Sequence, residues 1–453
     1  MEDQESLTKT IAKGGILFSI NKLIEIIISL VSGFLVIELL SVYDYGLWRL
    51  ILSALSIFLI FTFPAITQIT IYDTSVEYGK QNFKNYKAIL KQYSYLSLGL
   101  GALLCLILFF FAPIISIVTG KNLTLFFQIV SFSILAGGIM NIYYVFFYSD
   151  LRLKTIAALK ILSQVLNTVL IFIFLLFLKM GLKGMALAYT LPSLIIVFVF
   201  LPIFIKKASF LRKIEEGDRK IFWQGLKKHG KWALSEDYLT EFLANLRPWI
   251  IGYFLGVNSV AMFSIAQSFY GVVASSLPLD QVMKSVIPRT IADKEKFNRL
   301  FQKSIKYSTW IYTAFLIFSF IFAPTFIRIV FPKYIPATPL FYIFLFNLLP
   351  LGASVILSEV FYSLKAQKGL FTSSLVKVFS TSIILPLFIL LFGVKGAVLE
   401  FTLSAYLLFL ARYFMIKKFK PDISINLLEL FKFDEYDKIM LSRIINKIKR
   451  GFK

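Results

Sequence analysis

The sequence predicts an all-α integral membrane protein of about twelve transmembrane helices, arranged as two similar six-helix bundles. Three observations lead to this prediction. Of the 453 residues, 58% are hydrophobic, and the mean hydropathy is +0.78. The apolar residues fall in runs of roughly 20, which is the length that crosses a ~30 Å hydrocarbon layer. The second half of the chain also resembles the first at an offset of about 214 residues.

The internal repeat is carried by three pairs of short segments. A membrane protein built from two similar bundles has a natural substrate site at the seam between them, near the bilayer midplane. A transporter is therefore the leading hypothesis. The paired segments are 40–48 with 255–263, 147–149 with 361–363, and 181–187 with 393–399.

Twelve candidate spans follow from the apolar runs, six of them before the polar segment 206–231 and six after it. We therefore expect an N-terminal six-helix bundle (1–205), a basic cytoplasmic linker with a short surface helix (206–231), a C-terminal six-helix bundle (232–417) and a cytoplasmic tail (418–453). The predicted spans are 14–38, 47–71, 92–118, 123–148, 155–178, 184–205, 232–255, 260–283, 307–331, 338–363, 370–392 and 396–416.

The net charge of +23 is distributed unevenly between the two sides of the predicted membrane. With the N-terminus in the cytoplasm, that side carries roughly 37 of the 48 Lys and Arg residues, against roughly 6 on the other side. This bias follows the positive-inside rule and places both termini in the cytoplasm. The basic excess therefore indicates topology and attraction to anionic membrane lipids rather than binding of nucleic acid.

The tail from Pro421 onward alternates apolar residues with Lys and Arg. This pattern is typical of an amphipathic helix that lies on the inner leaflet. We expect such a helix to anchor the chain at the membrane surface, and a regulatory or partner-binding role is the alternative.

Charged and polar side chains concentrate in the first predicted span of each half. An ionisable group near the bilayer centre costs about 2.5–3.5 kcal/mol, so each one invites a functional explanation. In span 14–38, Lys22 and Glu25 are three residues apart and share a helix face, and Asn21 adjoins them. In span 232–255 a polar stripe is predicted to include Glu236, Asp237, Thr240, Glu241, Asn245 and Arg247.

The repeat makes these two polar surfaces equivalent, since position 22 corresponds to position 237. We therefore hypothesise a water-filled cavity between the halves, lined by charges from both spans. The alternative is that the charges only pair across a bundle interface and fix its register. Three further cations, Arg49, Lys160 and Lys377, are candidates for the cavity, although snorkelling to the membrane surface would also explain them.

Several kinds of chemistry are excluded by what the sequence lacks. One histidine (His229) and one cysteine (Cys105) cannot assemble a zinc, haem or iron–sulfur site, so no metal or cofactor is expected. No P-loop motif occurs, and no large outward loop exists to house an enzyme domain. An enzyme is therefore not expected. Transport would draw on an ion gradient, the membrane potential or the gradient of the substrate itself.

The polar opening span, Tyr45-Gly46-Leu47 at the first hairpin, Asn167, and the segment 181–187 with its repeat from Gly393 resemble one known family. It is the polysaccharide-transporter branch of the MOP (MATE-like) exporter superfamily, the Wzx-type flippases of O-antigen and capsule. The resemblance covers residues 5–418 and rests on hydropathy and glycines. It implies two six-helix bundles that face each other in a V, with spans 14–38 and 232–255 lining the cavity.

The resemblance also implies an oligosaccharide on a polyprenyl diphosphate as substrate, moved from the inner to the outer leaflet of the cell membrane by alternating access. Such an anion needs fixed positive charge, which arginine supplies bidentately. Lys22 and Arg247 are the first candidates, with Arg49, Lys160 and Lys377 behind them, and Asn21, Glu25 and Asn245 complete the expected lining.

Glu25, Asp237 and Glu241 are the candidates to couple transport to H⁺ or Na⁺. Polysaccharide-assembly proteins are the expected protein partners, and the chain is expected to act as a monomer. The alternative function is a cation-coupled drug or metabolite exporter of the MATE type. Acidic and aromatic cavity walls would favour that exporter, whereas the mixed charges here favour an anionic substrate.

Overall fold

The computed structural model describes residues 24–62, 64–229, 231–277, 279, 283, 287, 294–364, 366–421, 423, 432–433 and 437. All regular secondary structure in these ranges is helical, which confirms the predicted fold class.

Within the same ranges, nine helices are long and apolar enough to cross a membrane, or ten if the bent pair Pro332–Leu345 and Leu348–Ser363 forms one span. The predicted spans 14–38 and 232–255 are not among them. The first is described only from residue 24, where a helix runs to residue 39. The second corresponds to α9, which contains several charged residues. The count of twelve therefore stays a prediction.

The chain divides into two compact units, each built from separate stretches of sequence. The first comprises Met1–Ala266, Phe326–Leu340 and Lys377–Glu400. The second comprises the remaining residues, which are Gln267–Thr325, Phe341–Val376 and Phe401–Lys453. These two units are defined by which residues pack together in space, whereas the predicted boundaries after residues 205, 231 and 417 were placed from the sequence repeat. The predicted boundaries therefore stay a prediction.

Two helices, not one, occupy the predicted span 47–71, and only the first of them is a candidate membrane span. The first of them, α2, begins after Ser41, whose Oγ accepts a hydrogen bond from the Asp44 backbone N–H (3.0 Å) and donates one to Asp44 Oδ2 (2.8 Å). This helix ends at Ile60, and α3 starts at Pro64. Proline lacks a backbone N–H and suits the first position of a helix rather than its interior.

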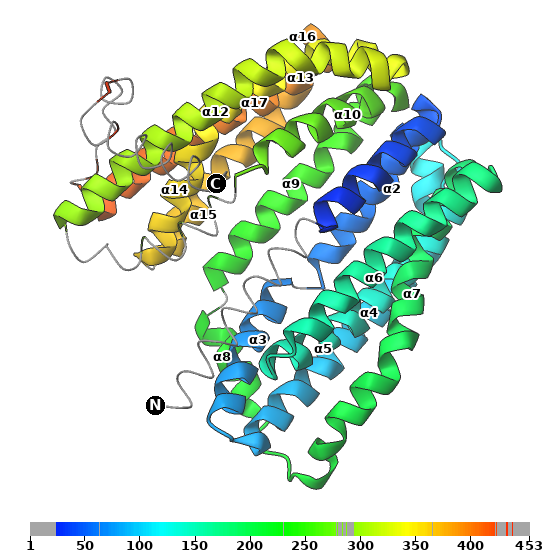
Figure 1. Cartoon of the computed structure of the whole chain (residues 1–453), viewed down its shortest axis with the longest axis vertical. Coiled ribbons are helices and arrows are strands. Elements are labelled where there is room, and N and C mark those ends of the chain that lie inside the picture. Colours follow the sequence, from blue (N-terminus) through cyan, green and yellow to red (C-terminus); the bar gives the residue numbers. More distant parts are fainter. Residues whose placement is uncertain are drawn as a thin grey trace, which may run out of the picture. The chain divides into compact units, whose positions relative to one another are not determined.

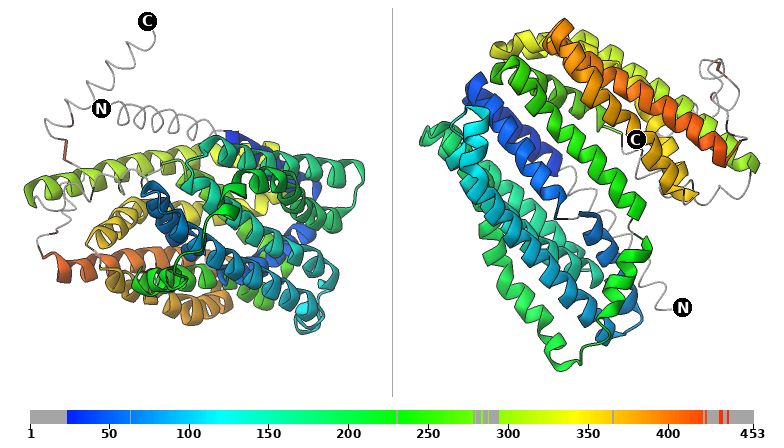
Figure 2. Two further views of the ribbon diagram at one scale, coloured as in Figure 1. Left: turned by 90° about the horizontal axis from the view of Figure 1, so that it is seen from below. Right: turned by 180° about the vertical axis from the view of Figure 1, so that it is seen from behind.

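Long helices pack side by side in the first unit. α4 lies along α5, α5 also contacts α7, and α6 packs against α7; Figures 1 and 2 show α4 and α5 running next to each other. Buried aromatic side chains such as Tyr86, Phe146 and Phe147 fill the core between them. The bounds are α2 Val42–Ile60, α3 Pro64–Gly79, α4 Phe83–Thr119, α5 Thr124–Ser149, α6 Leu153–Ile171, the π-helix η1 Phe172–Phe177, α7 Gly181–Ala208, the 3₁₀ helix η2 Ser209–Lys213, α8 Lys220–His229, α9 Lys231–Leu255 and α10 Val257–Ala274, whose last turns belong to the second unit.

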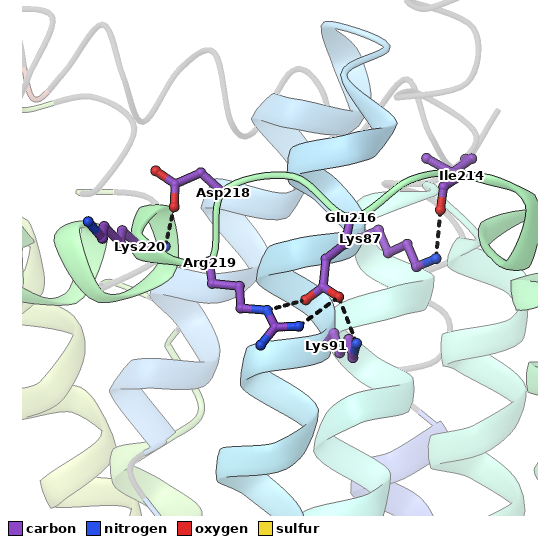
Figure 3. A network of polar contacts seen from close by, with 7 residues as sticks. All are labelled: Lys87, Lys91, Ile214, Glu216, Asp218, Arg219 and Lys220. Atoms are coloured by element: carbon purple, nitrogen blue, oxygen red, sulfur yellow. Dashed lines mark hydrogen bonds and ion pairs between the residues drawn. The ribbon is translucent and has the colours of Figure 1, made fainter.

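The linker between η2 and α8 is attached to the start of α4 by polar contacts (Figure 3). Glu216 forms ion pairs with Lys91 (2.7 Å) and Arg219 (2.9 Å), and Lys87 Nζ donates to the Ile214 carbonyl (2.6 Å). Hydrogen bonds from Lys91 and Arg219 hold the pKa of the Glu216 carboxyl below its ordinary value. The linker contains a short helix, α8, where one was predicted. Its position at the membrane surface stays a prediction.

The second unit has its own aromatic and aliphatic core. Phe297 and Phe301 of α12, Leu357 and Phe361 of α14, and Ile416 of α17 lie in one buried cluster. The remaining elements are α12 Lys294–Val330, the 3₁₀ helix η3 Pro332–Ala337, α13 Thr338–Leu345, α14 Leu348–Ser363, α15 Gln367–Phe379, the π-helix η4 Ser380–Ile384, α16 Leu385–Phe392 and α17 Val394–Phe419. Of these, η3, η4 and α16 belong to the first unit, as do the end of α12, the start of α13, the end of α15 and the first turns of α17.

The repeat seen in the sequence returns in the helices themselves. Both α4 and α12 have 37 residues, and each has a proline near its C-terminal end, Pro113 and Pro324. A π-helix, η1 or η4, interrupts the corresponding span of each half. Gly181 and Gly393, at matching positions of the repeat, both have positive φ angles (55° and 60°), which glycine tolerates without strain.

Candidate functional site

Arg247 of α9 is joined to Glu400 of α17 in a buried ion pair within the first unit. Arg247 Nε donates to Glu400 Oε2 at 3.1 Å, and Nη2 donates to Oε1 at 3.3 Å. The arginine side chain is 8% exposed and the glutamate side chain 0%. Because a guanidinium can bind a carboxylate through two parallel hydrogen bonds, this geometry neutralises both charges in an apolar surrounding.

The π-helix η4 supplies further partners to this pair. Ser380 Oγ donates to Glu400 Oε1 at 2.7 Å, and Arg247 Nη2 donates to Thr381 Oγ1 at 3.3 Å. Both hydroxyl residues are themselves buried. A single π-turn inside a membrane span commonly marks a functional position. Here it brings two neighbouring hydroxyl groups into one polar cluster with the ion pair.

A second set of contacts lies on the same face of α9 as Arg247. Thr240 Oγ1 donates to Glu236 Oε1 at 3.3 Å, and Lys377 Nζ donates to Thr240 Oγ1 at 3.5 Å. Positions 236, 240 and 247 share this face because their spacing is close to whole helical turns. Glu236 is buried there.

The rest of the predicted stripe on α9 lies elsewhere. Glu241 is exposed, and Asn245 Nδ2 donates to the Glu241 carbonyl of its own helix at 2.8 Å. The side chain of Asp237 lies outside the described residues. The polar residues of α9 therefore divide between two faces instead of forming one stripe.

The opening span contacts Gln164 of α6 through two of its polar groups. Gln164 Nε2 donates to Ser29 Oγ at 2.7 Å and to the Glu25 carbonyl at 3.4 Å. Lys160 lies four residues before Gln164, so it belongs to the same face of α6. Asn21 and Lys22 lie outside the described residues.

Arg49 and Lys160 differ from the other predicted cations. Both are half-buried, Arg49 on α2 and Lys160 on α6, and neither forms a hydrogen bond or ion pair with any described residue. Arg247 and Lys377 do have such contacts. Neither Arg49 nor Lys160 therefore has an internal polar partner among the described residues.

The sequence analysis missed Glu400, Ser380 and Thr381. Glu400 had a usable signal, since it is an acidic residue inside the predicted span 396–416. Its partner Arg247 is 153 residues away in the chain, and one sequence gives no information on which distant charges meet. The two hydroxyl residues had no signal, because Ser and Thr are common in membrane helices. The roles predicted for the cavity residues stay predictions.

Residues 35–337 match the model of a protein family described as polysaccharide biosynthesis protein. No curated protein sequence matches the chain. The fold is similar to that of an inward-facing multidrug resistance MATE family transporter of the MOP superfamily, at 15% identity over 90% of this chain and 98% of that chain (TM-score 0.72).

It is also similar to that of the lipid II flippase MurJ in an inward closed conformation, at 17% identity over 95% of this chain and 93% of that chain (TM-score 0.68). The Vibrio cholerae MATE transporter VcmN in its bent form has 14% identity over 94% of this chain and 100% of that chain (TM-score 0.57).

These similarities confirm the resemblance predicted from the sequence. They identify the chain as a multi-pass membrane protein with the fold of the MOP superfamily. The matched structures are those of transporters and a flippase.

Proposed function

This chain belongs to the polysaccharide biosynthesis protein family, and we propose on that premise that it is a flippase for an oligosaccharide linked to polyprenyl diphosphate. The family match, which covers residues 35–337, is the observation that carries the proposal. The fold it shares with a lipid II flippase supports it. The lipid would move from the cytoplasmic to the outer leaflet of the cell membrane by alternating access, with both termini of the chain in the cytoplasm.

The diphosphate group of such a lipid requires fixed positive charge in a low-dielectric site. We propose Arg49 and Lys160 as its first ligands, because neither has a partner in the described residues. Lys22 joins them from the opening span. Arg247 can bind a phosphate only if Glu400 releases it, since the carboxylate already accepts two of its hydrogen bonds. Arg247 would therefore contribute in one conformational state rather than throughout the cycle.

The remaining predicted residues take supporting roles in this proposal. Asn21, Glu25 and Asn245 would line the cavity, and Lys377 would assist from α15. Glu25, Asp237 and Glu241 would couple transport to H⁺ or Na⁺. The chain would act as a monomer with membrane lipids around it, alongside polysaccharide-assembly proteins.

The alternative function is a cation-coupled drug or metabolite exporter. The structural similarity to a multidrug resistance transporter favours it. The two functions differ in the charge of their substrate: a cationic drug would be repelled by Arg49 and Lys160, whereas a diphosphate would be attracted. Charge at these two positions therefore separates the two hypotheses.

The test is flipping of a fluorescent polyprenyl-diphosphate oligosaccharide in proteoliposomes that contain the purified chain. Loss of fluorescence to a membrane-impermeant reductant on the outside measures exposure of the lipid. Wild-type protein should accelerate flipping, and Arg49→Gln and Lys22→Ala should each slow it sharply. Lys154→Gln, at an exposed lysine of α6, is the matched control and should flip at the wild-type rate.

Arg247→Ala should also slow flipping, and its unfolding temperature must be measured in parallel because the substitution leaves Glu400 unpaired. Proteoliposomes that expel a cationic dye but do not flip the lipid would overturn the proposal in favour of the exporter.

A further inference from the structure

A cluster of donors on α12 binds a carboxylate from the C-terminal tail within the second unit. Lys303 Nζ lies 3.2 Å from Asp437 Oδ1, Tyr307 Oη donates to the same oxygen at 2.6 Å, and Lys306 Nζ donates to Asp437 Oδ2. Lys306 also donates to the backbone carbonyl of Lys432. The Asp437 and Lys306 side chains are 1% and 6% exposed, so water is almost excluded from this contact.

An aromatic contact adjoins the carboxylate. The rings of Trp310 on α12 and Phe433 in the tail are stacked, with centroids 5.9 Å apart and planes inclined by 8°. Lys306 Nζ lies 4.9 Å from the centroid of the Trp310 ring. The described tail residues therefore contact α12 through one acidic and one aromatic side chain, although most of the predicted amphipathic tail lies outside the described residues.

The four side chains of α12 occupy one face of the helix, because their spacing is i, i+3, i+4 and i+7. Two lysines on adjacent turns repel each other unless an anion lies between them. Burying these charges carries a large desolvation free energy. Apolar residues of similar size would bind the tail to α12 without that penalty. Three donors that converge on one pair of oxygens are instead the arrangement that recognises an oxyanion.

We propose that Lys303, Lys306 and Tyr307 form a binding site for a phosphate group, and that the Asp437 carboxylate occupies this site until a phosphate displaces it. A phosphate monoester or diphosphate offers more oxygens and more negative charge than one carboxylate, so it competes for the same donors. Binding releases Asp437, and with it the stacked Phe433, from α12. The proposal does not depend on the flippase function, because it concerns only α12 and the tail.

The test follows the tail with a fluorophore that a nearby tryptophan quenches. Phe433→Cys is introduced into a Cys105→Ser chain and labelled with bimane, so that Trp310 quenches the label while the tail is bound. The full chain is placed in phosphatidylcholine nanodiscs. One arm adds inorganic pyrophosphate, and a second arm incorporates phosphatidic acid, which separates a soluble phosphate from a lipid headgroup.

We expect bimane emission to rise several-fold with pyrophosphate, with phosphatidic acid, or with both, and not with chloride at equal ionic strength. Asp437→Asn should give high emission without any phosphate. Because an internal occupant reduces apparent affinity by the fraction of open sites, Asp437→Asn should also lower the Kd for pyrophosphate about tenfold. Trp310→Phe should abolish quenching, and Lys417→Gln, at an exposed lysine of the same unit, should behave as the parent protein.

Lys306→Gln combined with Asp437→Asn should bind pyrophosphate at least tenfold more weakly than Asp437→Asn alone. Unchanged emission in both phosphate arms, or an equal rise with chloride, would overturn the proposal and leave the contact as a fixed part of the fold. Flipping measured on the same preparations distinguishes the two proposals, since a chain that does not flip lipid can still release its tail.

Discussion

The two halves of the repeat use their membrane charges differently. In the first half, Arg49 and Lys160 are half-buried and lack a hydrogen bond or ion pair in the described part of the chain. In the second half, Glu400 binds Arg247, and Lys377 donates to a threonine of α9. The helices of the two halves are alike, but their charges are not. The cations of the second half have internal partners, whereas Arg49 and Lys160 have none among the described residues.

Glu400→Gln is the strongest test of the internal neutralisation. It removes the carboxylate that pairs with the buried Arg247, and breaking a buried ion pair typically costs about 3–5 kcal/mol. We expect a large fall in the midpoint of thermal unfolding of the purified protein. The double variant Arg247→Met with Glu400→Gln should recover much of the loss, because it removes both charges. A wild-type midpoint for Glu400→Gln would show that the pair does not stabilise the second half.

Alanine substitutions at Gly184 and Gly396, which are equivalent in the repeat, test whether the helices pack equally closely in both halves. A Cβ at Gly396 would lie 1.8 Å from the Phe388 carbonyl oxygen, a backbone atom, whereas one at Gly184 would lie 2.9 Å from the side-chain Cβ of Met180. Overpacking costs about 1–3 kcal/mol, so we expect about 3 kcal/mol for Gly396→Ala and about 1 kcal/mol for Gly184→Ala.

The measurement is the unfolding midpoint of each glycine variant. Gly99→Ala is the control, since a Cβ there meets nothing within 4 Å and alanine favours a helix. Equal falls in the unfolding midpoint for Gly184→Ala and Gly396→Ala would show that the surroundings of the two glycines are packed alike.

The helical architecture could be predicted from the sequence because hydrophobic length and glycine position are local signals. The repeat predicted the pairing of Gly181 with Gly393, and both have the same unusual φ. The break before Pro64 was missed because the apolar run continues through it, although the proline itself was a signal. The partner of Arg247 was beyond reach, since a salt bridge between distant spans depends on how the helices pack. The prediction also placed Glu241 and Arg247 in one polar stripe, and the structure places them on different faces of α9.

Arg49→Gln and Lys160→Gln test the cations of the first half, which have no polar partner among the described residues. If these cations bind the diphosphate, each variant should flip the lipid about tenfold more slowly, which corresponds to about 1.4 kcal/mol. Their unfolding midpoints should match that of the wild type, because no hydrogen bond or ion pair with a described residue is lost. Lys377→Gln should have the reverse profile, with a lower midpoint and a smaller change in flipping. Slower flipping in Lys377→Gln than in Arg49→Gln, at equal stability, would reverse the assignment of roles.

The smallest expected effect comes from Glu216 in the linker, a half-buried residue whose ion pairs are more accessible to solvent than the Arg247–Glu400 pair. Hydrogen bonds from Lys91 and Arg219 lower the pKa of its carboxyl from the ordinary value of 4.5. The stabilisation is therefore complete above that value and is lost as the pH falls through the lowered pKa. The unfolding midpoint of Glu216→Gln should lie slightly below that of the wild type at pH 6, and the difference should vanish toward pH 3.

High salt should also shrink the difference for Glu216→Gln, because solvent screens exposed ion pairs, whereas the difference for Glu400→Gln should persist. If salt reduced the difference in unfolding midpoint between Glu400→Gln and the wild type, water would reach the Arg247–Glu400 pair. The cations of the two halves would then differ less in their surroundings than the structure indicates.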